Sequence, residues 1–304
     1  MSSTPAPAHT TATRPLDALA AAIVVALCLF WGFNQVAAKL AIADIPPLIQ
    51  AAIRSTGAAA IVAAWARLRG IPLTARDGTL VAGLVCGVCF GLEFILIYRG
   101  LLYTTATRAV LFIYLAPFFV VIGARWLLPV DRFSPQQWIG LGLSFAGMVV
   151  AFGLPTPALD PRQFIGDIMM VGGAAGWAAT TLIVKASALS RAPPEKVMLY
   201  QLVVSAPMMA FAALAFGERM TAMPGAVALG SLAYQTLWVA SVTFVVWFAL
   251  VLRYSANRLS AFTFLTPLFG VAAGHLVLGE PLTLAFAAAV VLVAGGLVLV
   301  NRAR

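Results

Sequence analysis

The chain has 304 residues, of which 62% are hydrophobic and 10% are charged, whereas a typical soluble domain carries about 25% charged residues. This composition excludes an ordinary soluble enzyme. The formal net charge is +9, but the basic residues are scattered in short groups between apolar runs, so the charge indicates membrane topology and not nucleic-acid binding.

Along the chain, a tail is followed by ten apolar runs. Residues 1–17 are rich in Pro, Thr and Ala and predict a disordered tail. Each run after it is long enough for a spanning helix, which needs about 20 apolar residues. Short connections with turn formers or charge are typical of an antiparallel bundle, so the sequence predicts an all-α membrane protein with ten transmembrane helices. The runs are 18–42, 46–66, 79–101, 104–128, 134–153, 164–187, 196–216, 225–251, 258–279 and 282–301.

The basic residues lie mainly on one side of these runs. With the N-terminus in the cytoplasm, thirteen Lys and Arg residues fall on the cytoplasmic side and five on the other, while Arg54 lies inside a run. Short cytoplasmic loops of membrane proteins carry an excess of Lys and Arg. We therefore expect a multi-pass protein of the cell inner (plasma) membrane with cytoplasmic N- and C-termini.

Two motifs recur in the two halves of the chain. In the first and sixth runs a Trp precedes a Lys by eight residues, in WGFNQVAAK from Trp31 and WAATTLIVK from Trp177. In the fourth and ninth runs, RAVLFIYLAPFF and RLSAFTFLTPLF place Arg, Phe, Leu, Pro and Phe in the same register. Five spans are an odd number, so 18–153 and 164–304, joined by the linker 154–163, would be inverted repeats. Such repeats are typical of secondary transporters with a midplane site.

Four stretches together carry a resemblance to a known family: FWGFNQVAAKLA, YTTATRAVLFIYLAPFF, RYSANRLSAFTFLTPLF and HLVLGEPLTLAF, which contains Glu280. The chain resembles the EamA family of the drug/metabolite transporter superfamily over nearly its whole length after residue 18. It departs from the family pattern after the fourth run, where LLPVDRF offers Asp131 in place of a Gly-Glu pair. The resemblance implies export of amino acids and related metabolites, and is closest to the YddG type, which exports aromatic amino acids.

Motifs for catalysis and for cofactor binding are missing from the sequence. It contains no G-x-x-x-x-G-K-[ST] loop and no H-E-x-x-H, and its histidines are His9 and His275. Cys28, Cys86 and Cys89 lie in apolar runs and are expected to pack as small residues. We expect no enzymatic activity, no cofactor and no metal. The expected partners are a small-molecule substrate and the lipid bilayer, without nucleic acid, and a monomer is compatible with the pattern.

Polar and aromatic side chains share one face of the first run and one face of the sixth. Trp31, Asn34 and Gln35 have the spacing i, i+3, i+4, and Trp177 and Thr181 form the corresponding face of the sixth run. We interpret these faces as a midplane pocket that stacks a flat apolar group and orients a polar one. The alternative is close helix packing through small and polar residues. Further aromatic residues predicted to contact substrate are Tyr114, Tyr234 and Trp238.

Two charged residues lie deep in neighbouring runs. Arg54 and Glu93 are each about eight residues from the same membrane surface, which is ~12 Å at 1.5 Å per residue. Charges at this depth need a partner, so we expect these two side chains to pair. The pair would be either a fixed link between two helices or a group for proton coupling or substrate contact.

Pro117 and Pro267 occupy equivalent positions in the repeated fourth and ninth runs. A proline removes one helix hydrogen bond and can kink the helix. The pairing predicts two hinges, although membrane helices also tolerate prolines without such a role.

The pattern favours a secondary transporter that exports small amphipathic metabolites by alternating access. A multidrug exporter of lipophilic cations is an alternative, which would require an uncompensated carboxylate in the pocket. A membrane-embedded lipid-modifying enzyme is a second alternative, which would require acids or histidines clustered at one membrane surface.

Overall fold

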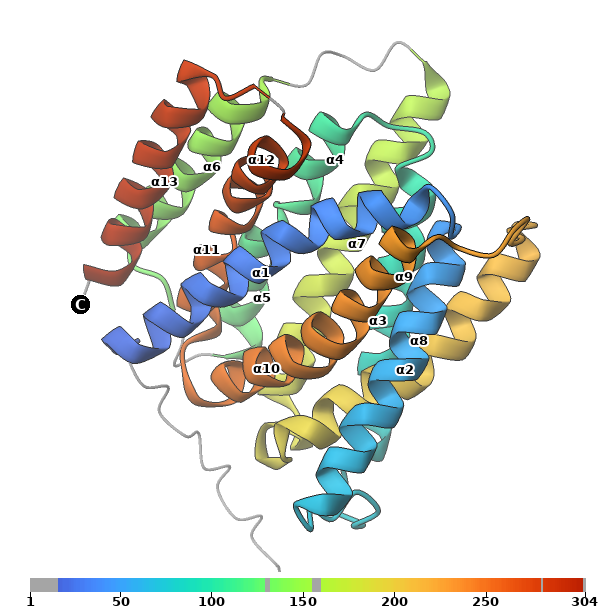
Figure 1. Ribbon diagram of the computed structural model, residues 1–304. Helices are drawn as coiled ribbons and strands as arrows, with labels where there is room; N and C mark the ends of the chain where they lie inside the picture. Colours follow the sequence, from blue (N-terminus) through green and yellow to red (C-terminus); the bar gives the residue numbers. More distant parts are fainter. Residues whose placement is uncertain (1–15, 129–131, 155–159, 280, 303–304) are drawn as a thin grey trace, which may run out of the picture.

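A computed structural model shows the chain as a bundle of helices (Figure 1). It describes residues 16–128, 132–154, 160–279 and 281–302. Within these ranges it contains helices and no strand. Most of the predicted tail (1–15), part of the predicted linker (155–159), Asp131 and Glu280 lie outside the described residues.

The helices of the first half follow the predicted apolar runs closely. Each begins and ends within a few residues of its run, and the fourth run is divided into two helices. They are α1 (Ala18–Ile42), α2 (Pro47–Leu68), α3 (Leu80–Gly100), α4 (Ala106–Ile113), α5 (Ala116–Leu127) and α6 (Pro135–Phe152).

The second half follows its runs in the same way, with the eighth and ninth runs divided. They are α7 (Pro161–Ala186), the short 3-10 helix η1 (Ala188–Arg191), α8 (Pro194–Ala215), α9 (Ala226–Ala233), the π-helix η2 (Tyr234–Thr243), α10 (Phe244–Arg253), α11 (Ala256–Phe262), α12 (Leu265–Leu278) and α13 (Leu284–Arg302).

Nine stretches of the described residues are long and apolar enough to cross a membrane. They correspond to nine of the ten predicted runs. The fifth run is also a helix, α6, of 18 residues, but it is not among the nine stretches. Its first turn, PQQW, is polar and lowers its mean hydropathy. The chain is therefore a multi-pass, all-helical membrane protein.

Local sequence explains where equivalent helices begin. The side chain of Thr105 accepts a hydrogen bond from the Arg108 N–H at the start of α4, over 3.3 Å. The side chain of Ser255 accepts one from the Arg258 N–H at the start of α11, over 3.2 Å. Side-chain oxygens at this position satisfy backbone donors that have no partner inside the helix. The same capping device thus starts the fourth and the ninth runs.

Two proline residues mark breaks in these same runs. Pro117 lies in the first turn of α5, directly after the interruption between α4 and α5, and Pro267 lies in the first turn of α12, directly after the interruption between α11 and α12. Proline has no N–H to donate to the fourth residue before it, and its ring displaces that carbonyl. The breaks stand where the sequence predicted kinks, and the role of the prolines as hinges stays a prediction.

The packing of the helices is symmetric between the two halves. When each helix is replaced by its counterpart in the other half, the resulting pair is also in contact. α6 packs along α13 and α2 along α8, and Figure 1 shows α6 and α13 side by side. α7 packs against α3 and against the α4–α5 run, while α1 packs against the α9–η2–α10 run and against α11–α12. Two groups of three spans result, defined here as wall A (α3, α4–α5, α7) and wall B (α1, α9–η2–α10, α11–α12).

Small residues allow α6 and α13 to approach closely. A Cβ atom added to Gly140 would lie 2.6 Å from the carbonyl oxygen of Gly296, which is too close for any side chain. Membrane helices commonly associate through such small residues because lipid offers no hydrophobic driving force between helices.

Candidate functional site

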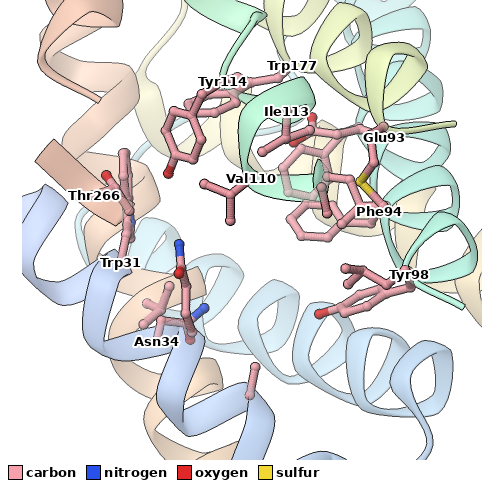
Figure 2. Close-up of a pocket in the computed structure, with 18 of the residues that line it drawn as sticks. Trp31, Asn34, Glu93, Phe94, Tyr98, Val110, Ile113, Tyr114, Trp177 and Thr266 are labelled. Atoms are coloured by element: carbon pink, nitrogen blue, oxygen red, sulfur yellow. The ribbon is translucent and has the colours of Figure 1, made fainter. Parts of the chain in front are cut away.

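A cavity of about 530 Å³ lies between wall A and wall B. Figure 2 shows side chains from both walls around an open space, with Trp31 and Asn34 on one side and Phe94 and Tyr98 on the other. The volume is within the range of about 300–1,000 Å³ that is common for small-molecule sites. Seven of the ten side chains predicted for substrate contact or the ion pair line this cavity: Trp31, Asn34, Gln35, Arg54, Glu93, Tyr114 and Trp177.

The other three predicted side chains do not line the cavity. Thr181 is buried beside it, and its hydroxyl donates to the Trp177 carbonyl over 3.3 Å. The Tyr234 hydroxyl donates to the Phe30 carbonyl over 3.1 Å. Trp238 is 40% exposed and packs edge-on against Phe30. Tyr234 and Trp238 were expected at the site as further aromatic residues of a span. Both lie in the π-helix η2, whose wider turn changes which residues share a face.

The indole of Trp31 is held in place by wall B. Its Nε1–H donates to the Thr243 hydroxyl over 2.9 Å, and that hydroxyl donates in turn to the Val239 carbonyl over 2.6 Å. The ring lies 5.3 Å from Trp247 and 5.7 Å from Phe244, between ring centroids. The indole is therefore a fixed apolar surface of the cavity, because its polar atom already has a partner.

Wall A also provides an aromatic surface of the cavity, through Tyr114. The Tyr114 ring lies 6.0 Å from Trp177, edge to face, and 6.2 Å from Phe264. Tyr114 follows the last residue of α4, at the break before Pro117. The break thus positions an aromatic side chain at the cavity.

Aromatic residues of α3 complete the cavity and were missed by the sequence analysis. Phe90, Phe94 and Tyr98 all line it. They recur every four residues, a spacing that places them along one face of a helix. This periodicity is a signal in the sequence that could have found them.

Arg54 and Glu93 face the same cavity without direct contact. No Arg54 nitrogen lies within 4.0 Å of a Glu93 oxygen among the described residues. The Arg54 guanidinium instead lies 4.5 Å from the centroid of the Phe94 ring. Successive residues of a helix point about 100° apart, so stacking on Phe94 directs the guanidinium away from its neighbour Glu93. The expected direct pair is not formed in this conformation.

A buried ion pair that the sequence did not predict joins α4 to α7. Asp167 accepts hydrogen bonds from the Thr104 hydroxyl over 2.6 Å and from Arg108 Nε over 3.1 Å, and it pairs with Arg108 Nη2. The side chains of Arg108 and Asp167 are 8% and 7% exposed. This cluster fixes two helices of wall A to each other.

A related contact occurs in wall B. The Tyr254 hydroxyl donates to an oxygen of Asp17 over 2.7 Å, as the Thr104 hydroxyl donates to Asp167. Residue 254 follows residue 104 by 150 positions, and residue 167 follows residue 17 by the same number. Each wall therefore ties its proline-broken span to the helix beside it with a hydroxyl–carboxylate hydrogen bond.

Outside the spans, a further ion pair fastens the connection between α2 and α3 to α8. Asp77 accepts from the Lys196 ammonium over 2.8 Å and from the Thr79 hydroxyl over 2.5 Å. These hydrogen bonds, that of Lys196 first, lower the pKa of Asp77 to about 2. They favour the carboxylate form at neutral pH.

The comparisons with known proteins identify the family. The model of the EamA-like transporter family matches residues 18–153 and 164–302. The uncharacterized transporter YvbV of Bacillus subtilis (strain 168) is 28% identical over 291 residues, covering 92% of this chain and 91% of its own length. The uncharacterized transporter YoaV of the same organism is 23% identical over 266 residues, covering 86% and 89%.

A solved crystal structure shares the fold. It has a TM-score of 0.79 at 21% sequence identity, and the match covers 92% of this chain and 96% of that one. The family match spans most of the sequence, and the related proteins are named as transporters and not as enzymes. The chain belongs to the EamA-like transporter family and is a membrane transporter.

Proposed function

We propose that the protein is a secondary transporter that exports small amphipathic metabolites, including aromatic amino acids, by alternating access around the cavity. The observation that carries this proposal is the cavity of about 530 Å³ between wall A and wall B, whose spans correspond between the two halves of the chain. A site between two corresponding walls can be opened alternately at either end when the walls rock.

The architecture for this motion is ten spans in two inverted repeats, 18–153 and 164–304, with α6 as the fifth span. Three observations support it: the exchange of packing partners between the halves, the two proline breaks, and the hydroxyl–carboxylate contacts 150 residues apart. Pro117 and Pro267 are the hinges in this account, because each interrupts a span beside the cavity.

The structure corresponds to an outward-facing state in this proposal. The cavity extends along α1 from Trp31 to Ile42 in its last turn, roughly 16 Å at 1.5 Å per residue. With both termini in the cytoplasm of a cell with an inner membrane, as the basic residues favour, the end of α1 at Ile42 lies on the far side of that membrane.

The composition of the lining supports an amphipathic cargo. Trp31, Tyr114 and Trp177 provide flat apolar surfaces for an aromatic or aliphatic body. Arg54 provides a cation and Glu93 a carboxyl group within the same cavity, which suits a molecule that carries an anionic and a hydrogen-bonding polar group. Proton coupling would depend on Glu93, and facilitated diffusion requires no such group.

Export of lipophilic cations is the second candidate, and one observation favours it. Glu93 has no direct ion pair with Arg54 among the described residues, and aromatic walls attract cations. Arg54 argues against it, because an unneutralised guanidinium in the cavity repels a cationic cargo.

Uptake into proteoliposomes distinguishes the two candidates. Radiolabelled phenylalanine, tetraphenylphosphonium and 3-phenylpropanoate are offered with and without a proton gradient. We expect saturable uptake of phenylalanine that Trp31→Ala abolishes. Uptake of tetraphenylphosphonium without any of phenylalanine would overturn the proposal in favour of the cation exporter.

A further inference from the structure

We propose that Arg54 is the group in the cavity that recognises a carboxylate on the cargo, so that the site selects molecules carrying this anion. The inference rests on the proposed function in taking the cavity as the transport site, and it adds the chemical group that the cargo must carry.

The first observation is the burial of an unpaired cation. Arg54 is 3% exposed, and its Nε and Nη2 atoms have no hydrogen-bond partner in the described part of the chain. It lies in the N-terminal half of α2 and lines the cavity. Charges within a membrane are costly and are normally paired or functional, so a guanidinium with unused donors at a cavity predicts an anionic ligand.

The second observation is the aromatic neighbour of the guanidinium. Arg54 Cζ lies 4.5 Å from the centroid of the Phe94 ring. An aromatic ring attracts the positive charge but offers no oxygen acceptor to the N–H groups. A carboxylate can accept two parallel hydrogen bonds from such N–H groups.

The third observation is that the nearby acid does not occupy these donors. Glu93 lines the same cavity, but among the described residues it makes no ion pair with Arg54 within 4.0 Å. Figure 2 shows Glu93 and Phe94 on neighbouring positions of α3 beside the open space. Glu93 therefore does not occupy these donors of the Arg54 guanidinium, which are left for an anion that enters the cavity.

Matched pairs of probes test this assignment. L-Phenylalanine is compared with L-phenylalaninamide, and 3-phenylpropanoate with 3-phenylpropanamide; each pair differs only in having a carboxylate or a neutral amide. Binding is measured by the thermal stabilisation of the purified full-length protein, and transport by uptake into proteoliposomes. We expect the wild-type protein to prefer each carboxylate by about tenfold or more, the range of a hydrogen bond to a charged group.

Substitutions then assign the preference to one side chain. Arg54→Gln should reduce the ratio of carboxylate binding to amide binding to about one. Arg54→Lys should retain part of this preference, because a point charge remains. Arg99→Gln is the matched control: Arg99 also stacks on an aromatic ring, that of Phe216 at 4.0 Å, but does not line the cavity. It should keep the wild-type ratio.

The possible results separate this inference from the proposed function. An unchanged carboxylate preference in both Arg54 variants would overturn the inference, even if phenylalanine is transported. Arg54-dependent binding of 3-phenylpropanoate without any transport of amino acids would support the inference and overturn the amino-acid cargo. If Arg54→Gln does not fold, Arg54→Lys and the wild-type preference between the amide and carboxylate probes decide the question.

Discussion

The buried cluster around Asp167 gives the most quantitative prediction. Its carboxylate accepts from Thr104 and Arg108, and the side chains of the ion pair are 8% and 7% exposed. Asp167→Ala removes the carboxylate that pairs with the Arg108 guanidinium. Removing one partner of a buried pair typically costs about 3–5 kcal/mol, so we expect a loss of stability of this size.

Unfolding in mixed detergent micelles, followed by tryptophan fluorescence, measures this loss. Asp160→Asn is the control, since Asp160 caps the same helix from an exposed position and Asn caps about as well as Asp. The double variant Arg108→Met/Asp167→Leu removes both charges and should cost less than Arg108→Met or Asp167→Leu alone, because it removes the ion pair as a whole. Additive losses in the double variant would refute the reasoning.

Three further predictions follow from other parts of the structure. Gly140→Val should destabilise the protein by at least the ~1–3 kcal/mol typical of overpacking, because its Cβ would lie 2.6 Å from a backbone oxygen of α13; wild-type stability in the same unfolding assay would contradict this packing. Because the folded-state pKa of Asp77 is about 2 and its ordinary value about 3.9, its contribution to stability is present above about pH 4 and is lost as the pH falls through about 2. Unfolding curves between pH 5 and 2 should therefore show a smaller loss of stability in Asp77→Asn than in the wild-type protein, and an equal loss in the two proteins would exclude a contribution from Asp77. Pro117→Ala and Pro267→Ala should each slow transport, because a restored helix hydrogen bond stiffens the break; unchanged uptake rates in both variants would show that the breaks are not hinges.

Hydropathy was sufficient to place the helices. Water is absent from the bilayer core, so each segment must satisfy its backbone hydrogen bonds internally as a helix, and the apolar runs map directly onto spans. The run 18–42 became α1 with the same limits. Proline chemistry placed the helix breaks near Pro117 and Pro267, because the missing N–H is a local property.

The site was predictable only where the helices are regular. Trp31, Asn34 and Trp177 reach the cavity because α1 and α7 keep α-helical periodicity. Tyr234 and Trp238 do not, because a π-helix has no clear signal in a single sequence. The Arg54 side chain lies over the Phe94 ring and does not pair with Glu93. This contact depends on how α2 and α3 pack, whereas the expected pair was based only on the depth of the two residues in the membrane.

The uptake rate of a cross-linked protein tests most directly whether the two walls move about the cavity. Ala38 of α1 and Ala106 of α4 line the cavity from opposite walls. Both are replaced by cysteine after Cys28, Cys86 and Cys89 have been changed to alanine, and a flexible bifunctional thiol reagent that a reductant cleaves joins them. We expect cross-linking to stop phenylalanine uptake and reduction to restore it. Uptake at the uncross-linked rate while the link is intact would contradict alternating access at this site.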